Sequence, residues 1–544
     1  MLDFVNRFYP ARYTAFLLVL LLFIVNSLWS LLTGQGWSTF LIWAALLALG
    51  LHDVRQNHHA ILRNYPIIGH LRFLMEYIRP EIRQYFIESE TESAPFSRAQ
   101  RSLVYSRAKG QSDKRPFGTQ KDVQATGYEW LTHSMNPTQI ASADFRIQVG
   151  TNACAKPYAI SLFNVSAMSF GALSANAVLA LNQGARLGGF AHDTGEGSIS
   201  RHHRVHGGDL IWEIGSGYFG CRNDDGTFSE EKFQAQAVDP QVKMIEIKLS
   251  QGAKPGHGGV LLGPKVTPEI AEARGVPVGV DCVSPATHSS FDSPEGLLRF
   301  VQRLRELSGG KPTGFKLCVG HPWEWFAIAK AMASTRIVPD FIVIDGSEGG
   351  TGAAPLEFSD HMGMPMTEGL RLVHNTLVGL NLRQQIKLGA SGKIVSAFDI
   401  ARALALGANW CNSARGFMFA LGCIQAQTCH SGHCPTGVTT QDAVRQQALV
   451  VPDKAQRVKN FHHHTLDALK ELLEASGVNA PGEISLRHIM RRISSTETRP
   501  LSDLYASIVP GSLIDARPLD LAVGGPIFER HWAIANPASW TPLH

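Results

Sequence analysis

The feature that most constrains the fold of this chain is a repeating alternation of short apolar runs with amphipathic helical segments. From residue 158 onward, each apolar run ends in Gly, Ser or a polar residue and a helical pattern follows it. Such alternation predicts a parallel sheet, and eight units predict that the sheet closes. We therefore expect an α/β fold of the (β/α)8 (TIM) barrel class. The eight predicted strands cover 159–165, 189–192, 244–248, 278–283, 314–319, 341–345, 385–388 and 408–412.

Several helical segments open with Ser or Thr at a plausible N-cap, as in SANAVLALNQGARL, SPEGLLRFVQRLREL and SAFDIARALALG. A Ser side chain at this position satisfies a free backbone N–H of the first turn. The longest interruption of the alternation spans 198–240, and we expect this segment to cover the mouth of the site.

Two glycine-rich turns follow the last two apolar runs. Glycines after a strand let backbone N–H groups approach an anion, and the next helix adds its positive dipole end. In a TIM barrel the turns after strands seven and eight are the usual phosphate site. One such turn alone is typical of an ordinary loop, but two in succession, the second with an arginine, predict a bound phosphate. The residues expected to hold it are Gly389, Ser391, Gly392, Arg415 and Gly416.

Three cysteines follow in a C-x5-C-x4-C pattern, at Cys423, Cys429 and Cys434. Three thiolates match the ligand count of a [3Fe-4S] cluster. The alternatives are a zinc site completed by His430 or His433 and three buried reduced thiols.

The other cysteines are scattered and show no disulfide framework, which indicates a reducing compartment. Cys411 could add a fourth ligand, which would allow a four-iron cluster. The net charge of +4 over 544 residues includes no basic stripe with interleaved aromatic residues, so the sequence predicts no nucleic-acid partner.

The N-terminal end has no Asp, Glu, Lys or Arg between Tyr13 and His52. Its length fits two membrane spans of ~20 residues each. We expect spans at 15–32 and 37–51, joined by a turn at Gly34 to Gly36. By the positive-inside rule, basic residues on both sides place both ends, and the catalytic part, on the cytoplasmic side of the inner membrane; these are Arg7, Arg12, Arg55, Arg63 and Arg72. The alternatives are a cleaved signal peptide and a buried core hairpin.

The predicted organisation has four parts: a membrane hairpin at 1–59, a connecting extension at 60–150, the barrel with its cysteine loop at 151–441, and a helical extension at 442–544. Helices are expected at 466–476 and 484–493. The C-terminal extension packs on the barrel or on a neighbour in a possible homo-oligomer.

The predicted strand ends carry mostly small residues with a few cations. Small residues let a flat ring lie against the barrel, and a lysine near the N1 and O2 atoms of a flavin stabilises its reduced form. Lys316 is the candidate for that role, and its alternative role is a salt bridge at a strand end. The other expected cofactor contacts at strand ends are Met168, Ser169, Gly349 and Gly350.

Six ordered motifs between about residues 160 and 441 resemble the FMN-binding synthase domain of glutamate synthase. They are MSFGALS (168–174), DTGEG (193–197), QGAKPGHGG (251–259), DGSEGGTGAAP (345–355), GASGK and GCIQAQTCHSGHCPTGVTTQ. The resemblance implies a barrel with FMN and a [3Fe-4S] cluster on the three cysteines. It also implies condensation of 2-oxoglutarate with ammonia, followed by reduction of 2-iminoglutarate to L-glutamate. The N-terminal hairpin is similar to that of short, membrane-attached relatives.

The same resemblance implies the catalytic residues Glu196, Gln251, Lys254 and Arg274. Lys254 and Arg274 are the cations expected on the two substrate carboxylates.

The chain departs from the family pattern at two substrate positions. His257 stands where the family usually has Glu, and Val260 stands where it usually has Gln. Val260 offers no hydrogen bond to a dicarboxylate, so the keto acid can differ from 2-oxoglutarate. The sequence also leaves no room for a glutaminase domain, so ammonia is expected from solution or from a partner.

The sequence shows no G-x-G-x-x-G dinucleotide fingerprint after a strand. We therefore expect a separate electron donor, either a ferredoxin or an NAD(P)H flavoprotein. The alternative function is a membrane-anchored flavin and iron–sulfur electron-transfer protein that acts on another substrate.

Overall fold

The computed structural model describes residues 11–91, 94–150, 153–514 and 518–543. The chain divides into two compact units, Met1–Ser89 and Glu90–His544.

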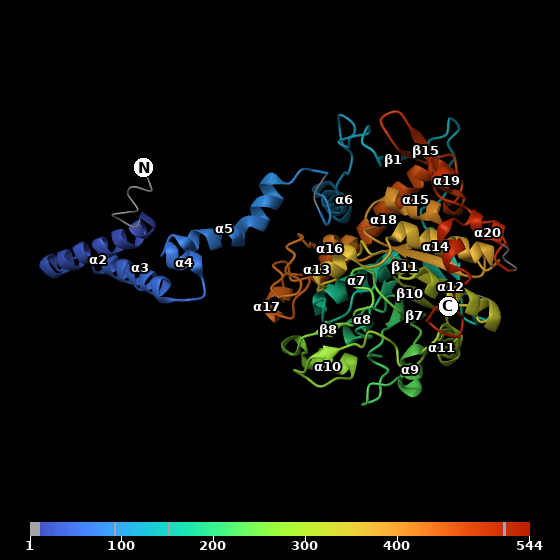
Figure 1. The fold of residues 1–544 in the computed structure, drawn as a ribbon, viewed down its shortest axis with the longest axis horizontal. Coiled ribbons are helices and arrows are strands. Elements are labelled where there is room, and N and C mark those ends of the chain that lie inside the picture. Colours follow the sequence, from blue (N-terminus) through green and yellow to red (C-terminus); the bar gives the residue numbers. More distant parts are fainter. Residues whose placement is uncertain (1–10, 92–93, 151–152, 515–517, 544) are drawn as a thin grey trace. The chain divides into compact units, whose positions relative to one another are not determined.

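The larger unit contains a closed barrel of eight parallel strands, which confirms the predicted fold class (Figure 1). Each strand pairs with the next along the barrel, and the last strand closes on the first through Cys411 and Phe163. The strands are β4 (Phe163–Val165), β5 (His192–Asp193), β6 (Leu210–Ile214), β7 (Val242–Lys248), β10 (Thr313–Leu317), β11 (Phe341–Asp345), β12 (Lys387–Ser391) and β13 (Trp410–Ser413). The two glycine-rich segments therefore lie at the ends of strands seven and eight of the barrel, but the first predicted turn was placed too early, because Gly389 and Ser391 belong to β12 itself and only Gly392 follows it.

One of the eight predicted strands was wrong. The third barrel strand is β6, which lies inside the segment 198–240 that was expected to cover the site. The predicted strand at 278–283 contains only β9 (Cys282–Val283), which pairs antiparallel with β8 (Val260–Leu261) outside the barrel. The reason is local: the connection between β5 and β6 holds only the four-residue helix α8 (Arg201–Arg204), so no amphipathic helical pattern sets β6 apart, whereas the valines of 278–283 read as a strand.

An apolar layer fills the barrel interior near the N-terminal ends of the strands. Inward-facing side chains of four barrel strands form it together with the antiparallel pair β2 (Arg146–Val149) and β3 (Tyr158–Ser161). The layer includes Ala191, Ile211, Met244, Val343 and Trp410. Because side chains of a strand alternate in direction, residues two positions further along each strand also face the interior.

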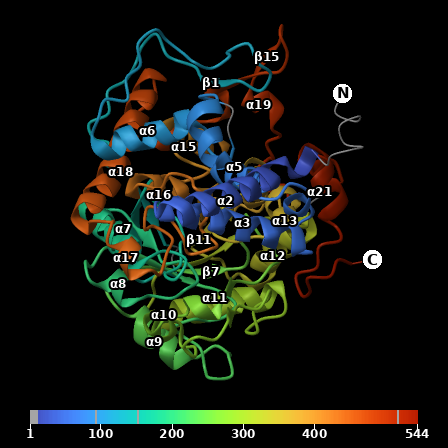
Figure 2. The ribbon, with the colours of Figure 1, turned by 90° about the vertical axis from the view of Figure 1, so that its left-hand side faces the viewer.

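Helices surround the barrel (Figure 2). They are α7 (Ala175–Gly188), α11 (Pro294–Leu307), α12 (Pro322–Thr335), α14 (Met366–Gly379), α15 (Ala397–Leu406) and α16 (Arg415–Leu421). Ser174, Ser293 and Ser396 accept hydrogen bonds from backbone N–H groups at the starts of α7, α11 and α15. The predicted serine caps are thus confirmed.

Segments from both ends of the larger unit pack beside the barrel. Helix α18 (Val451–Ala475) contacts α7 and α6 (Arg98–Lys109) and includes the predicted helix at 466–476. The helix predicted at 484–493 was wrong, because β14 (Ile489–Arg492) forms a sheet with β1 (Glu129–Leu131) and β15 (Thr498–Pro500). Pairing with a strand about 360 residues away in the chain overrides the local helical pattern.

The smaller unit contains two apolar helices, α2 (Thr14–Thr33) and α3 (Trp37–Arg55), which pack against each other. Gly34 and Gly36 between them have φ values of 68° and 88°, a left-handed conformation that suits glycine. Both helices are long and apolar enough to cross a membrane. Helices α4 (Ala60–Asn64) and α5 (Gly69–Ile82) follow.

Candidate active site

A cavity of about 330 Å³ lies among the loops that follow the barrel strands. This volume is in the range of sites that hold cofactors and small molecules. Its walls include Met168 after β4, Glu196 after β5, Lys254 after β7 and Arg415 after β13. We call this cavity the barrel pocket. It lies where TIM-barrel enzymes carry their active sites.

The barrel pocket brings together many of the residues predicted from the sequence. They are Met168, Ser169, Glu196, Gln251, Lys254, Arg274, Gly350, Arg415 and Cys429. Six predicted cofactor contacts do not line it: Lys316, Gly349, Gly389, Ser391, Gly392 and Gly416. Their proposed roles stay predictions.

Four cations that line the barrel pocket form no ion pair with a carboxylate in the described part of the chain: Lys254, Arg274, Arg415 and Lys265, the last of which donates to the His430 carbonyl. Lys254 Nζ donates to the Gly258 carbonyl at 3.3 Å, Arg274 Nη2 to the Phe170 carbonyl at 3.0 Å, and Arg415 Nη2 to the Thr351 carbonyl at 2.7 Å. The buried Nε of Arg274 has no hydrogen-bond partner at all among these residues. Burial of Lys254 lowers its pKa. Glu196 supplies the nearest negative charge, and Lys248 already pairs with it, so the further cations of the pocket favour an anionic ligand.

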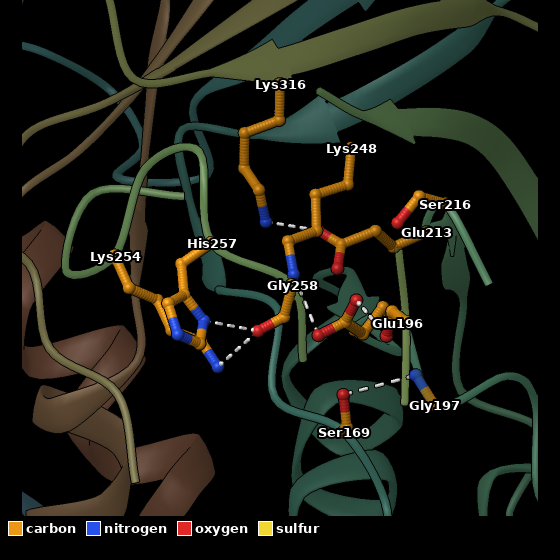
Figure 3. Close-up of polar contacts among 12 residues, drawn as sticks. Ser169, Glu196, Gly197, Glu213, Ser216, Lys248, Lys254, His257, Gly258 and Lys316 are labelled. Carbon is orange, nitrogen blue, oxygen red and sulfur yellow. Dashed lines mark hydrogen bonds and ion pairs between the residues drawn. The ribbon is translucent and has the colours of Figure 1, made fainter. Parts of the chain in front are cut away.

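A fifth cation, Lys248, pairs with Glu196 at 2.8 Å (Figure 3). Ser284 Oγ also approaches Glu196, at 3.4 Å. Burial raises the pKa of Glu196, but the charge and hydrogen bond of Lys248 outweigh this and lower the pKa to about 2. Glu196 is therefore a carboxylate at neutral pH. Lys248 was not among the predicted site residues, although its position at the end of β7 was a usable signal.

The two departures from the family pattern lie near this ion pair. His257 Nδ1 lies 2.7 Å from the Gly258 carbonyl, next to Lys254 (Figure 3). Val260 lines the barrel pocket with 50 % of its surface exposed. An apolar side chain thus stands in a wall otherwise rich in cations.

The glycines of the phosphate turns meet specific neighbours. A Cβ at Gly389 would lie 2.7 Å from the Trp410 ring, and a Cβ at Gly350 would lie 3.1 Å from Arg415 Nε. Ser391 Oγ donates to Asp345 at 2.5 Å. Gly350 is therefore needed for the placement of Arg415, whereas Gly389 serves packing inside the barrel.

Lys316 lies in the barrel interior, where it forms ion pairs with Glu213 and Glu246. Glu213 itself lines the barrel pocket. Sequence reasoning missed Glu213 because it lies on the unpredicted strand β6.

A smaller cavity next to the barrel pocket is lined by all three predicted metal ligands, Cys423, Cys429 and Cys434. We call it the cysteine cavity. Cys411 lies in β13 and lines neither cavity.

Burial and hydrogen bonds together set the pKa of two of these thiols. Burial would raise the pKa of Cys434, but hydrogen bonds with Thr436 and Thr439 outweigh it and lower the pKa to about 7. The thiolate is the form that binds metal. Burial raises the pKa of Cys423 to about 11, and the Gln425 N–H lies 3.5 Å from its sulfur.

Comparison with known proteins shows to which family the chain belongs. Residues 121–479, well over half of it, match the conserved region in glutamate synthase. The chain belongs to the glutamate synthase family. It is 39 % identical over 483 residues to the glutamate synthase large subunit-like protein YerD of Bacillus subtilis, covering 81 % of this chain and 91 % of that protein.

More distant members of the glutamate synthase family share a shorter region. The archaeal-type glutamate synthase [NADPH] of Thermotoga maritima is 35 % identical over 316 residues, which are 58 % of this chain and 59 % of that protein. The glutamate synthase [NADPH] large chain of Bacillus subtilis is 33 % identical over 331 residues, 20 % of its length. The family resemblance seen in the sequence is thus confirmed, and the chain is a glutamate synthase-like oxidoreductase.

Proposed function

We propose that the chain is an FMN and iron–sulfur oxidoreductase that forms L-glutamate from 2-oxoglutarate and ammonia through 2-iminoglutarate. The observation that carries this proposal is that Lys254, Arg274 and Arg415 line one pocket and form no ion pair with a carboxylate of the described residues. A cofactor phosphate and a dicarboxylate together supply the negative charges that these cations lack.

Arg415 and the turn around Gly350 fit the phosphate of FMN, because they combine a cation with a glycine that leaves room beside it. The small residues Gly195 and Ser169 of the pocket wall fit a flat ring. When bound, FMN supplies both one-electron and two-electron chemistry to the site.

The cysteine cavity supports an iron–sulfur cluster beside this ring. Met418, Cys429 and Thr439 line both the cysteine cavity and the barrel pocket. When bound there, the cluster supplies one-electron transfer at the pocket wall. Single electrons fit a separate donor, for which we propose a ferredoxin or an NAD(P)H flavoprotein.

The chain's own residues have distinct roles in this proposal. Lys254 and Arg274 bind the two carboxylates, and Gln251 orients the keto acid. Glu196, held ionised by Lys248, accepts hydrogen bonds from the ammonium ion and from the protonated imine nitrogen. Its low pKa excludes it as a proton donor near neutral pH.

The proposal is tested with purified full-length protein that has been reduced chemically under anaerobic conditions. Addition of 2-oxoglutarate and ammonium is expected to reoxidise the flavin and to produce glutamate. A flavin that stays reduced with every 2-oxo acid, but passes its electrons rapidly to a quinone, would instead favour the electron-transfer function. Val260 would then mark a lost dicarboxylate site.

We further propose that α2 and α3 form a membrane hairpin whose two ends face the cytoplasm. The supporting features are their length, their exposed apolar side chains and the basic residues that flank them.

The hairpin predicts the labelling pattern of introduced cysteines in intact cells. A Gln35→Cys variant, in the turn between the helices, is expected to react with a membrane-impermeant maleimide. The matched Gln111→Cys variant, exposed just after α6, is expected to react only after cell lysis. Equal labelling of both variants in intact cells, or of neither after lysis, would contradict this topology.

A further inference from the structure

The barrel interior holds three carboxyl groups beneath the barrel pocket. Asp193 on β5, Glu213 on β6 and Glu246 on β7 each place an oxygen within 4.8 Å of the other two. All three are buried, with at most 2 % of their surface exposed. They lie two residues beyond Ala191, Ile211 and Met244 of the apolar layer, so they form the next layer toward the pocket.

The register of the strands forces these charges together. Glu213 and Glu246 are direct partners on the neighbouring strands β6 and β7. Like charges directly opposite each other destabilise a sheet, and low dielectric increases the repulsion.

The positive charge beside the three carboxyls is too small to neutralise them. Lys316 from β10 pairs with Glu213 and lies 3.6 Å from Glu246. Asp345 on β11 adds a further negative charge near Lys316, although it accepts hydrogen bonds from Ser391 Oγ and the Gly252 N–H. Asp193 accepts one from the Gly195 N–H at 3.0 Å. With all three carboxyls ionised, they and Lys316 would carry a net charge of −2, that is −3 + 1.

Of the three carboxyls, Glu246 is the one whose ionised form its surroundings stabilise least. No hydrogen-bond donor of the described chain reaches either of its oxygens, and none of its surface is exposed. Burial and the neighbouring Asp193 raise its pKa well above the usual range. Burial and Glu213 raise the pKa of Asp193 to about 7. Two carboxyls this close share a proton rather than ionise together.

We propose that Asp193, Glu213 and Glu246 form a proton store beneath the barrel pocket, in which Asp193 and Glu246 share a proton and Glu213 connects it to the pocket. This use of the store rests on the proposed function. A 2-oxo acid, ammonium, two electrons and two protons give the amino acid and water. The store supplies one of the two protons through Glu213, and the resulting carboxylates are stabilised by Lys316 until solvent returns the proton.

The test with the sharpest readout is infrared spectroscopy of the purified full-length protein. A protonated carboxyl has a C=O stretch that is separate from that of a carboxylate. Wild-type protein at pH 7.5 is expected to show this band, and Glu246→Gln is expected to lose it. The matched control is Glu129→Gln, which removes a buried carboxylate already paired with Arg402 and Arg491 and leaves the band in place.

The proposal is overturned if wild-type protein lacks the band at pH 7.5 or if Glu246→Gln retains it. Metal analysis provides another decisive result, because three carboxyls can also bind a divalent cation. A stoichiometric cation that is lost in Glu246→Gln would replace the proton store with a metal site. None of these readouts needs the amination activity, so a failure of the proposed function stays distinguishable from a failure of the store.

The pH dependence of unfolding gives a second measurement. The native state retains a proton that the unfolded chain has released, so the contribution of the store to stability is fully present below about pH 4 and is lost as pH rises through about 7. Glu246→Gln is expected to flatten this decline, whereas Glu129→Gln is expected to preserve it. A wild-type stability that does not fall between pH 5 and 8 would contradict the store.

Discussion

Replacing Lys254 with Ala is expected to weaken the binding of the 2-oxo acid by more than tenfold while FMN stays bound. Lys254 is buried in the barrel pocket and, among the described residues, donates a hydrogen bond only to the Gly258 carbonyl. Loss of a charge-assisted hydrogen bond costs ~1.5–3 kcal/mol, which corresponds to roughly 10- to 150-fold in affinity. Titration of the oxidised protein with 2-oxoglutarate, followed through the flavin absorbance, measures the change.

The matched control is Lys387→Ala, since Lys387 begins β12 at the opposite end of the barrel and, in the part of the chain that the structure describes, donates only to the Gln384 carbonyl. This variant loses the same side chain and is expected to bind the keto acid like the wild type. Arg274→Ala is expected to resemble Lys254→Ala. Unchanged affinity in both pocket variants would mean that the substrate binds elsewhere.

The barrel could be predicted from the sequence because its units repeat. An error in one unit did not change the count, since the missed strand β6 and the mistaken strand at 278–283 offset each other. The miss has a local cause. Only the four-residue helix α8 separates β5 from β6, so the alternation of strand and amphipathic helix on which the prediction rests is interrupted there.

The cations of the site could also be predicted, because Lys254 and Arg415 lie in loops whose motifs are continuous in sequence. The carboxyl cluster could not. Asp193, Glu213 and Glu246 come from three strands, and only the register of those strands shows that they meet. The C-terminal sheet is a similar case, because Arg491 reaches Glu129 across the whole length of the barrel sequence.

The cysteine cavity leads to the prediction with the largest effect on electron supply. Cys429 lines both the cysteine cavity and the barrel pocket. If the proposed cluster and FMN are bound, Cys429→Ala is expected to lose most of its iron but to retain FMN, because the proposed phosphate contacts, Arg415 and Gly350, lie in other segments. Substitution of groups that merely support a metal ligand already costs about 10- to 100-fold in affinity or activity. Reduction by a physiological electron donor is expected to fall by at least that factor.

The control and the readouts separate a lost cluster from a damaged pocket. Cys411→Ala removes another buried thiol, in β13, that lines neither cavity, and it is expected to retain iron. Chemically reduced Cys429→Ala is still expected to be reoxidised by 2-oxoglutarate and ammonium, since Lys254 and Arg274 are intact. Iron lost in Cys411→Ala as well would indicate a four-iron cluster with Cys411 as a ligand. Full iron content in Cys429→Ala would remove the cysteine cavity from the electron path, because a three-thiolate site cannot keep its metal with one ligand missing.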